Sequence, residues 1–200
     1  MDLLLRMLLG GFDVIVGITG ASGSVLAKVL LKNLSALVDI CHIVATDNGA
    51  QVFEYETGLE LGAFLADMPN IVRHSCHDMF APIASGSFDA PGMAIVPCSM
   101  ATVGKLANGI GDNLLLRAAD VMLKERKTLV IVPRETPMHA THLCNLAKLA
   151  TLGAVILPPV PAFYDRVETW DNMVNGVVGR ILKQLGFTND LYKKWSGVYV

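Results

Sequence analysis

Charged residues are scarce in this chain of 200 residues. Asp, Glu, Lys and Arg together make up 17% of it, whereas about 25% is usual in a soluble domain. The formal net charge of -2 argues against nucleic-acid binding. Hydrophobic residues reach 52%, so we expect one domain with a large core, and a surface partly covered by other subunits of a homo-oligomer.

Cysteines are few and widely spaced. The four form no C-x-x-C pair, which argues against a disulfide framework and a structural zinc site. Two histidine groups, His139 with His142 and His74 with His77, also lack zinc spacing. We therefore expect no metal and a location in the reducing cytoplasm. The cysteines are Cys41, Cys76, Cys98 and Cys144.

Long hydrophobic runs are missing as well. No apolar stretch approaches the ~20 residues that a membrane-spanning helix needs. Residues 1–12 are apolar but short, with Asp2 and no basic leader, so they are interpreted as an N-terminal extension rather than a signal peptide. We expect one domain over 13–187, followed by a C-terminal tail over 188–200.

The chain does contain a regular alternation of apolar strands and helical segments. Strands are predicted from Val14 and over 40–45, 93–96, 128–132 and 154–157. Helices are predicted over 25–34 and 47–57, from 102 to about 124, and in segments ending near 152 and 186. Residues 58–91 are less regular. Apolar strands that alternate with helices predict an α/β fold with a mostly parallel sheet covered on both faces.

Polar residues gather where the predicted strands end. Ligands of open parallel sheets bind beyond the carboxyl ends of the strands, so we expect these segments to converge on one site. They are TGASGS (19–24), Thr46-Asp47, PCSMAT (97–102), PRETP (133–137) and PPVPAFYD (158–165).

The first of these segments joins a strand to a helix through three glycines. Gly17, Gly20 and Gly23 are spaced G-x-x-G-x-x-G, which is neither the dinucleotide G-x-G-x-x-G nor a P-loop. Free backbone N–H groups at the start of a helix favour a phosphate. The alternative is an ordinary turn with a serine cap.

The PRETP segment places Arg134 beside Glu135. Such a pair offers a cation for an anion and a carboxylate for proton transfer. The alternative is a solvated surface pair. Farther along, Arg180 interrupts an apolar helical stretch, so it should have an anionic partner from a ligand or another subunit.

Eight segments, in order along nearly the whole chain, resemble the UbiX flavin prenyltransferases. They are TGASGS, YET (55–57), ASGS (84–87), PCS (97–99) with Thr102, DNLLLRAAD (112–120), LKER (123–126), VPRETP (132–137) and GAVILPPVPAFY (153–164). The resemblance implies a single-domain, three-layer α/β/α fold of flavodoxin- or Rossmann-like type, bound FMN and a homododecamer.

The resemblance also implies an activity. A dimethylallyl group passes from dimethylallyl monophosphate to reduced FMN, first at N5 and then at C6. The product, prenylated FMN, serves a UbiD-type decarboxylase. Diphosphate-using prenyltransferases usually hold magnesium through paired aspartates, and this sequence has no adjacent pair, so we expect a metal-independent reaction.

Site residues follow from the matching positions. FMN contacts are implied for Gly20, Ala21, Ser22, Thr46, Ser99, Met100, Ala101, Thr102 and Arg134. The donor phosphate is assigned to Lys124, Arg134, Tyr164 and Arg180, partly across subunit boundaries. Ser22, Glu56, Arg117, Lys124 and Glu135 match further active-site positions. Met79 or Phe80 stands where some members carry a tryptophan that packs on the isoprenoid.

Two other functions stay open at this stage. One is an FMN-dependent decarboxylase of cysteine peptides or phosphopantothenoylcysteine. Those enzymes carry an Asn-rich segment and a Met-Asn clamp, where this chain has PCSMAT and VPRETPMH. The other is a flavin carrier without catalysis. The alternative for Lys124 is a solvated residue at a helix end. The alternative for Tyr164 is a core aromatic residue whose hydroxyl contacts water.

Overall fold

The computed structural model describes residues 12–163, 169–192, 195 and 197. Six parallel strands form one sheet in the order β3-β2-β1-β4-β5-β6. This is the doubly wound order, in which the chain direction across the sheet reverses between β1 and β4. The strands are β1 Val14–Ile18, β2 Cys41–Ala45, β3 Ile71–His74, β4 Gly92–Cys98, β5 Thr128–Pro133 and β6 Val155–Ile156.

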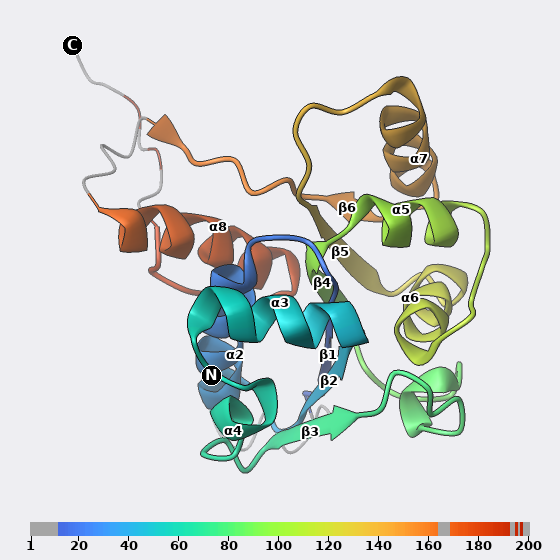
Figure 1. The fold of residues 1–200 in the computed structure, drawn as a ribbon, viewed down its shortest axis with the longest axis horizontal. Coiled ribbons are helices and arrows are strands. Elements are labelled where there is room, and N and C mark those ends of the chain that lie inside the picture. The colour runs from blue at the N-terminus through green and yellow to red at the C-terminus, as the bar shows by residue number, and fades with distance from the viewer. Residues whose placement is uncertain (1–11, 164–168, 193–194, 196, 198–200) are drawn as a thin grey trace.

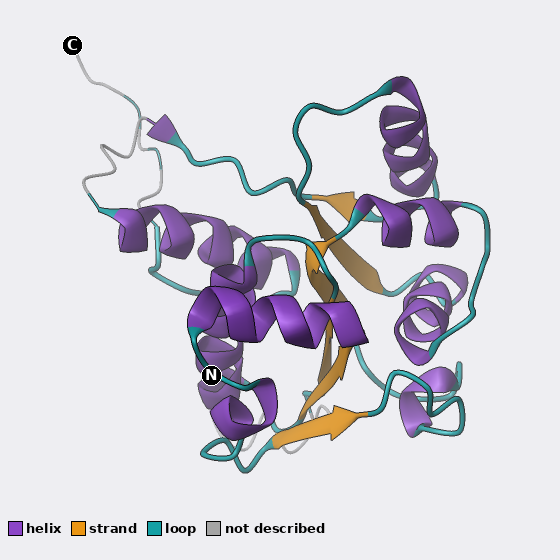
Figure 2. Ribbon diagram, viewed as in Figure 1, coloured by secondary structure: helices purple, strands orange, loops and turns teal. Residues whose placement is uncertain are grey.

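Helices cover both faces of the sheet (Figure 1). Helices α2 and α8 pack together on one face, and α5, α6 and α7 lie on the other (Figure 2). The helices are α2 Ser24–Leu37, α3 Asp47–Thr57, α4 Leu61–Leu65, α5 Met100–Ala107, α6 Leu114–Lys124, α7 Ala140–Thr151 and α8 Trp170–Gln184, with a 3-10 turn η1 at Pro82–Ala84. The predicted three-layer α/β/α fold is confirmed.

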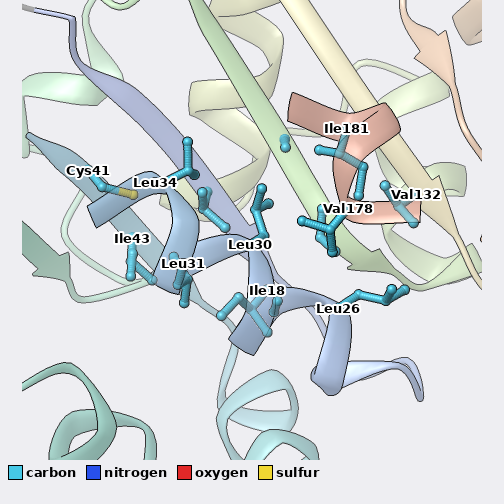
Figure 3. Packing of buried hydrophobic residues seen from close by; sticks show 14 of the residues in the cluster. Ile18, Leu26, Leu30, Leu31, Leu34, Cys41, Ile43, Val132, Val178 and Ile181 are labelled. Carbon is cyan, nitrogen blue, oxygen red and sulfur yellow. The ribbon is translucent and has the colours of Figure 1, made fainter. Parts of the chain in front are cut away.

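The core consists of two apolar layers, one on each side of the sheet. In β1, Ile18 faces α2 and α8, while Ile15 faces α5 and α6. Figure 3 shows Leu30 of α2 and Val178 of α8 packed over the first face. Both faces of β1 are buried, which explains its unbroken apolar run, since each buried aliphatic side chain stabilises the fold by about 1.5–3 kcal/mol.

The sequence prediction was wrong in two places. Strand β3 and helix α4 lie inside the segment that was interpreted as irregular. Strand β3 is at the edge of the sheet and only partly buried, so it lacks the apolar run of an inner strand. The single helix predicted after 102 is two helices, α5 and α6. They are separated at Gly109, whose φ of 69° belongs to the left-handed region.

No helix in the described ranges is long and apolar enough to cross a membrane.

Candidate functional site

The ends of β1 and β4 are joined by one buried hydroxyl. The Oγ1 atom of Thr19 donates to the carbonyl of Pro97 at 2.9 Å and accepts the N–H of Ser99 at 2.8 Å. Thr19 is 1% exposed. These bonds bring the segments after β1 and β4 together at the point where the sheet order reverses, which is where ligands of this architecture bind.

A cavity of about 550 Å³ opens beside this junction, and we call it the hydroxyl pocket. It is lined by Thr19, Gly20, Thr46, Asp47, Asn48, Cys76, His77, Ser99, Ala101, Thr102, Lys105, Asp112, Asn113 and Leu116. The structure therefore brings together five of the predicted FMN-contacting residues: Gly20, Thr46, Ser99, Ala101 and Thr102.

Two of the helices that begin at the hydroxyl pocket have a hydroxyl cap. Thr46 accepts the N–H of Gly49 at 3.0 Å to cap α3, and Ser99 accepts the N–H of Thr102 at 3.2 Å to cap α5. A hydroxyl that accepts such a bond keeps its own hydrogen to donate. Both positive helix ends and these donors suit a phosphate monoester.

Two glycines allow the turn after β1 to lie against α3. A Cβ on Gly20 would lie 2.7 Å from the Cβ of Asn48, and one on Gly49 would lie 2.5 Å from the carbonyl oxygen of Ile18. Larger residues would push the turn and the helix apart. The glycines therefore shape the wall of the hydroxyl pocket by close approach, rather than by special backbone angles.

Charged side chains also reach the hydroxyl pocket. The sequence analysis placed Asp47 at a converging strand end and noted His77, but it did not assign Lys105 or Asp112 to the site. Lys105 Nζ lies 2.6 Å from Asp112 Oδ2, and His77 Nε2 lies 3.4 Å from Asp47 Oδ2. Within the described part of the chain, Lys105 is the only lysine or arginine on this lining. It lies in the last turn of α5, where the helical pattern gave no functional signal.

A second cavity of about 440 Å³, the apolar pocket, lies between α2, α8 and the proline-rich segment after β6. Its lining includes the predicted residues Ser22, Glu56 and Arg134, surrounded by Gly23, Val25, Leu26, Pro159, Pro161, Trp170, Met173, Val174 and Val177. It offers a largely hydrocarbon surface with one carboxylate and one guanidinium. Such a surface suits an apolar chain that carries an anionic end.

The start of α2 is capped by Glu56 from the end of α3. Its Oε2 atom accepts the N–H groups of Gly23 at 2.9 Å and Ser24 at 2.7 Å. The N–H groups of Gly23 and Ser24 are therefore not free for a phosphate, and the alternative of a serine cap is wrong. Gly23 at the N-cap has no side chain to accept a bond, and a carboxylate 33 residues away accepts these N–H groups instead.

Glu56 is held in its ionised form. Burial opposes its charge, but hydrogen bonds from the Ser22 hydroxyl and from the N–H groups of Gly23 and Ser24 outweigh this, and they hold the pKa below its ordinary value. The Nε of Arg134 donates to the carbonyl of Ser22 at 3.2 Å. The turn between β1 and α2 is thus fixed between an anion and a cation.

Glu135 lies apart from these groups. Its Oε1 accepts the N–H of its neighbour Thr136 at 3.1 Å, and it lines neither the hydroxyl pocket nor the apolar pocket of the described chain. The sequence placed Arg134 and Glu135 together, but only Arg134 faces the apolar pocket.

Arg180 lines a third cavity of about 400 Å³, the Arg180 pocket, on the other side of the proline-rich segment. Its lining shares Pro161, Met173 and Val177 with the apolar pocket, so the two cavities are neighbours. No carboxylate of the described residues pairs with Arg180. Tyr164, predicted to act beside it, lies outside the described residues.

Arg117 and Lys124 are held away from these pockets. Arg117 donates from Nε to the carbonyl of Ala84 at 3.0 Å and pairs with Asp120 at 2.9 Å. Helix α6 starts at the hydroxyl pocket and ends at Lys124, about 16 Å away for eleven residues at ~1.5 Å each. Lys124 pairs with Glu125 and lines a separate basic cavity with Arg126 and Lys127.

The remaining predicted residues take different positions. Ala21 and Met100 are buried behind the pockets, with 6% and 8% exposure. Phe80 is fully exposed and Met79 partly so, on the loop between β3 and η1. Within a single chain, neither is among the residues that line the apolar pocket.

The histidine groups noted in the sequence do not come together around one point. His74 Nε2 lies 2.9 Å from His42 Nδ1, whereas His77 points to Asp47. Burial lowers the pKa of both His42 and His74. The described residues contain no group of three or more His, Cys, Asp and Glu side chains that could hold a metal.

Sequence comparison assigns the chain to a family. The model of the family called Flavoprotein matches residues 6–182. Flavin prenyltransferase UbiX of Alkalihalophilus pseudofirmus is 44% identical over 189 residues, which cover 90% of this chain and 94% of that protein. The chain belongs to the UbiX flavin prenyltransferase family.

Other members are equally similar. UbiX of Escherichia coli K12 is 44% identical over 92% of this chain and 97% of its own length. Flavin prenyltransferase LpdB of Lactiplantibacillus plantarum is 46% identical, over 92% of this chain and 98% of its own length. The similarity therefore extends across the pockets described above.

Solved structures agree with this assignment. A crystal structure of AnUbiX (PadA1) in complex with FMN and dimethylallyl pyrophosphate superposes with a TM-score of 0.89 at 38% identity, covering 94% of this chain and 99% of that one. A dodecameric FMN-dependent UbiX-like decarboxylase from E. coli O157:H7 gives 0.88 at 39% identity, over 93% and 100%. A phosphopantothenoylcysteine decarboxylase mutant, at 19% identity and 0.58, shares the fold alone.

Proposed function

We propose that this UbiX family member is a flavin prenyltransferase, which joins a dimethylallyl group to N5 and C6 of reduced FMN. The observation that carries the proposal is the adjacency of two complementary cavities at the carboxyl edge of the sheet. The hydroxyl pocket suits a phosphate, and the apolar pocket beside it suits a flat ring and a hydrocarbon chain. Ser22 and Arg134 lie on the wall of the apolar pocket.

The hydrogen-bond donors of the hydroxyl pocket fit the phosphate of FMN. Thr46, Ser99 and Thr102 would hold its phosphate with their hydroxyls, next to two helix starts. Gly20, Ala21 and Ser22 would contact the flavin through the turn after β1. Reduced FMN supplies the electron-rich ring that receives the dimethylallyl group.

Arg134 lines the apolar pocket and Arg180 lines the neighbouring Arg180 pocket, and we assign them, with Tyr164, to the donor phosphate. Breaking the allylic C–O bond leaves negative charge on the departing phosphate, so fixed cations stabilise that transition state. A monophosphate carries about 1.5 to 2 negative charges, which these side chains balance without a metal. Dimethylallyl monophosphate is therefore the proposed donor, although a relative has been crystallised with the pyrophosphate.

Glu56 and Ser22 form the polar part of the apolar pocket. Because Glu56 is held ionised, it accepts a hydrogen bond from the Ser22 hydroxyl and fixes that side chain on the wall of the apolar pocket. Glu135 is proposed to pass the proton that ring closure needs. Because Glu135 lies outside the apolar pocket of its own chain, we propose that it joins the active site only when subunits assemble.

The position of Lys124 supports an oligomer with shared sites. Lys124 lies about a helix length from the hydroxyl pocket of its own chain. We therefore propose that Arg117 and Lys124 contribute to the site of a neighbouring subunit. We propose the same for the exposed pair Met79 and Phe80. A dodecamer, as in the E. coli O157:H7 relative, provides such neighbours. We further propose that the protein works in the cytoplasm and passes prenylated FMN to a UbiD-type decarboxylase.

Analysis of the flavin that copurifies with the protein tests this function. We expect FMN together with a species heavier by one isoprenoid unit and with an altered absorbance spectrum. A protein that instead oxidises a cysteine peptide with bound FMN would be a decarboxylase of the wider group. One that only retains unmodified FMN, even when supplied with the donor and a reductant, would be a carrier.

A further inference from the structure

The chain after α8 folds back along that helix. The side chain of Asn189 donates to the carbonyl of Gly179 at 3.0 Å, and its Oδ1 accepts the N–H of Leu191 at 3.3 Å. The ring of Phe187 packs against Phe12, with centroids 5.8 Å apart. Residues 187–192, which we call the return segment, are thus bonded to α8 through Asn189 and through the N–H of Phe187, which donates to the carbonyl of Leu182 at 2.9 Å.

The return segment fits α8 closely at Gly179. A Cβ added there would lie 2.6 Å from Cδ1 of Tyr192 and 2.7 Å from Oδ1 of Asn189. Alanine would therefore push the segment off the helix. Gly179 itself is buried, so the contact between Tyr192 and α8 is part of the packed fold.

This contact places an aromatic ring against the next residue of the helix, Arg180. The guanidinium carbon of Arg180 lies 5.9 Å from the centroid of the Tyr192 ring, and both side chains line the Arg180 pocket. An arginine near an aromatic ring is attracted by its electron-rich face and stacks upon it. Since a free arginine samples many rotamers, a ring that restricts it reduces the entropy cost of binding an anion.

We propose that Tyr192 is a positioning residue for Arg180, and that it holds the guanidinium in the pocket that receives the phosphate of the donor. The inference rests on the proposed function, because it takes the anion to be the dimethylallyl phosphate. FMN does not depend on Tyr192, because Tyr192 lines neither the hydroxyl pocket nor the apolar pocket. Tyr192 thus affects the donor and leaves the flavin unaffected.

A double-mutant cycle separates this role from simple packing. Tyr192→Phe and Tyr192→Leu are made in the wild type and in Arg180→Ala, and donor KM, kcat and FMN affinity are measured for each. We expect Tyr192→Phe to stay within about twofold of the wild type, because the ring remains. Tyr192→Leu should raise the donor KM roughly three- to tenfold in the wild type and leave FMN affinity unchanged. In the Arg180→Ala background, Tyr192→Leu should cause no further rise in the donor KM.

Glycine variants provide a matched pair. Gly179→Ala should reproduce the donor defect of Tyr192→Leu, since it displaces the return segment. Gly104→Ala, the same change in α5, has room for its Cβ, with the nearest atom at 3.7 Å, and should leave the donor KM unchanged. Thermal unfolding of each variant verifies that the fold is retained.

Two results would overturn the inference. One is an equal effect of Tyr192→Leu in both backgrounds, which would make the ring a packing element only. The other is an unchanged donor KM in Tyr192→Leu with Arg180 present. Titration of dimethylallyl monophosphate binding by calorimetry gives the same cycle without turnover. A wild type that binds the donor but makes no adduct would contradict the proposed function. The effect of Tyr192 on donor binding could still be measured by calorimetry in that case.

Discussion

The hydroxyl of Thr19, at the end of β1, accepts the backbone N–H of Ser99 at 2.8 Å and so links the two loops that flank the reversal of the sheet. The same oxygen donates to the carbonyl of Pro97. One side chain therefore bonds a backbone group on each side of the reversal, although the Pro97 carbonyl also accepts the N–H of Thr19 at 3.2 Å.

Thr19→Val removes both bonds while preserving shape. We expect it to lower the free energy of unfolding by about 1–3 kcal/mol and to weaken FMN binding, because the Ser99 N–H loses its partner while the Pro97 carbonyl keeps the backbone N–H of residue 19. Chemical denaturation and flavin titration measure the two effects. Thr151→Val, which removes an exposed bond to the carbonyl of Ala147, is the control. Equal stability of the two variants would refute the structural role of Thr19.

Glu56 links stability to pH. Its pKa is lower in the folded protein than the ordinary 4.5, so its stabilising contribution is present above that value and is lost as the pH falls through the lower, folded value. Urea unfolding of the wild type should therefore show a loss of stability in this acidic range, and Glu56→Gln should show less of it. Parallel pH profiles for the two proteins would show that the carboxylate does not cap α2.

Lys105 supplies a cation to a pocket that also contains Asp47 and Asp112. Lys105→Met should weaken FMN binding, roughly five- to thirtyfold at low ionic strength for a charge-assisted contact, and should reduce the salt dependence of binding. Lys32→Met, an exposed lysine on α2, is the matched control. FMN affinity that is the same for both variants at low salt would remove Lys105 from the site.

Arg117 and Lys124 are predicted to act on a neighbour. Lys124→Ala and Arg134→Ala should each be nearly inactive alone. Coexpressed, they form mixed oligomers in which some sites take Arg134 from one subunit and Lys124 from another, so activity should partly return. Mixed oligomers that are as inactive as the separate variants would mean that each site uses residues of its own chain only.

The sequence predicted the architecture and the edge of the sheet that carries the site, because both depend on local patterns. Inner strands are continuous apolar runs, and Thr46 and Ser99 stand where hydroxyl caps are expected. Contacts between distant segments were not predictable. Glu56 was assigned to the site by resemblance, but its hydrogen bonds to the turn after β1 cross about 30 residues of chain.

Thr19 and Lys105 were not given roles of their own, for related reasons. Thr19 is the first polar residue after an apolar run, within the TGASGS segment expected at the site, and its two bonds form only because β4 lies beside it. Lys105 occupies an unremarkable position in a helix, and only the fold of the following loop brings Asp112 and the hydroxyl pocket to it. Edge strand β3 was not predicted, because its partly buried residues show no alternation of apolar and polar side chains.

The central claim is a metal-independent transfer from a monophosphate, and one assay tests it most directly. The protein is incubated anaerobically with reduced FMN and either dimethylallyl monophosphate or diphosphate, in excess EDTA or with magnesium, and the flavin is examined by mass and absorbance. We predict prenylated FMN from the monophosphate in EDTA, with the diphosphate a poorer donor. A strict requirement for magnesium, or faster turnover with the diphosphate, would contradict the assignment of Arg134 and Arg180 to the donor phosphate.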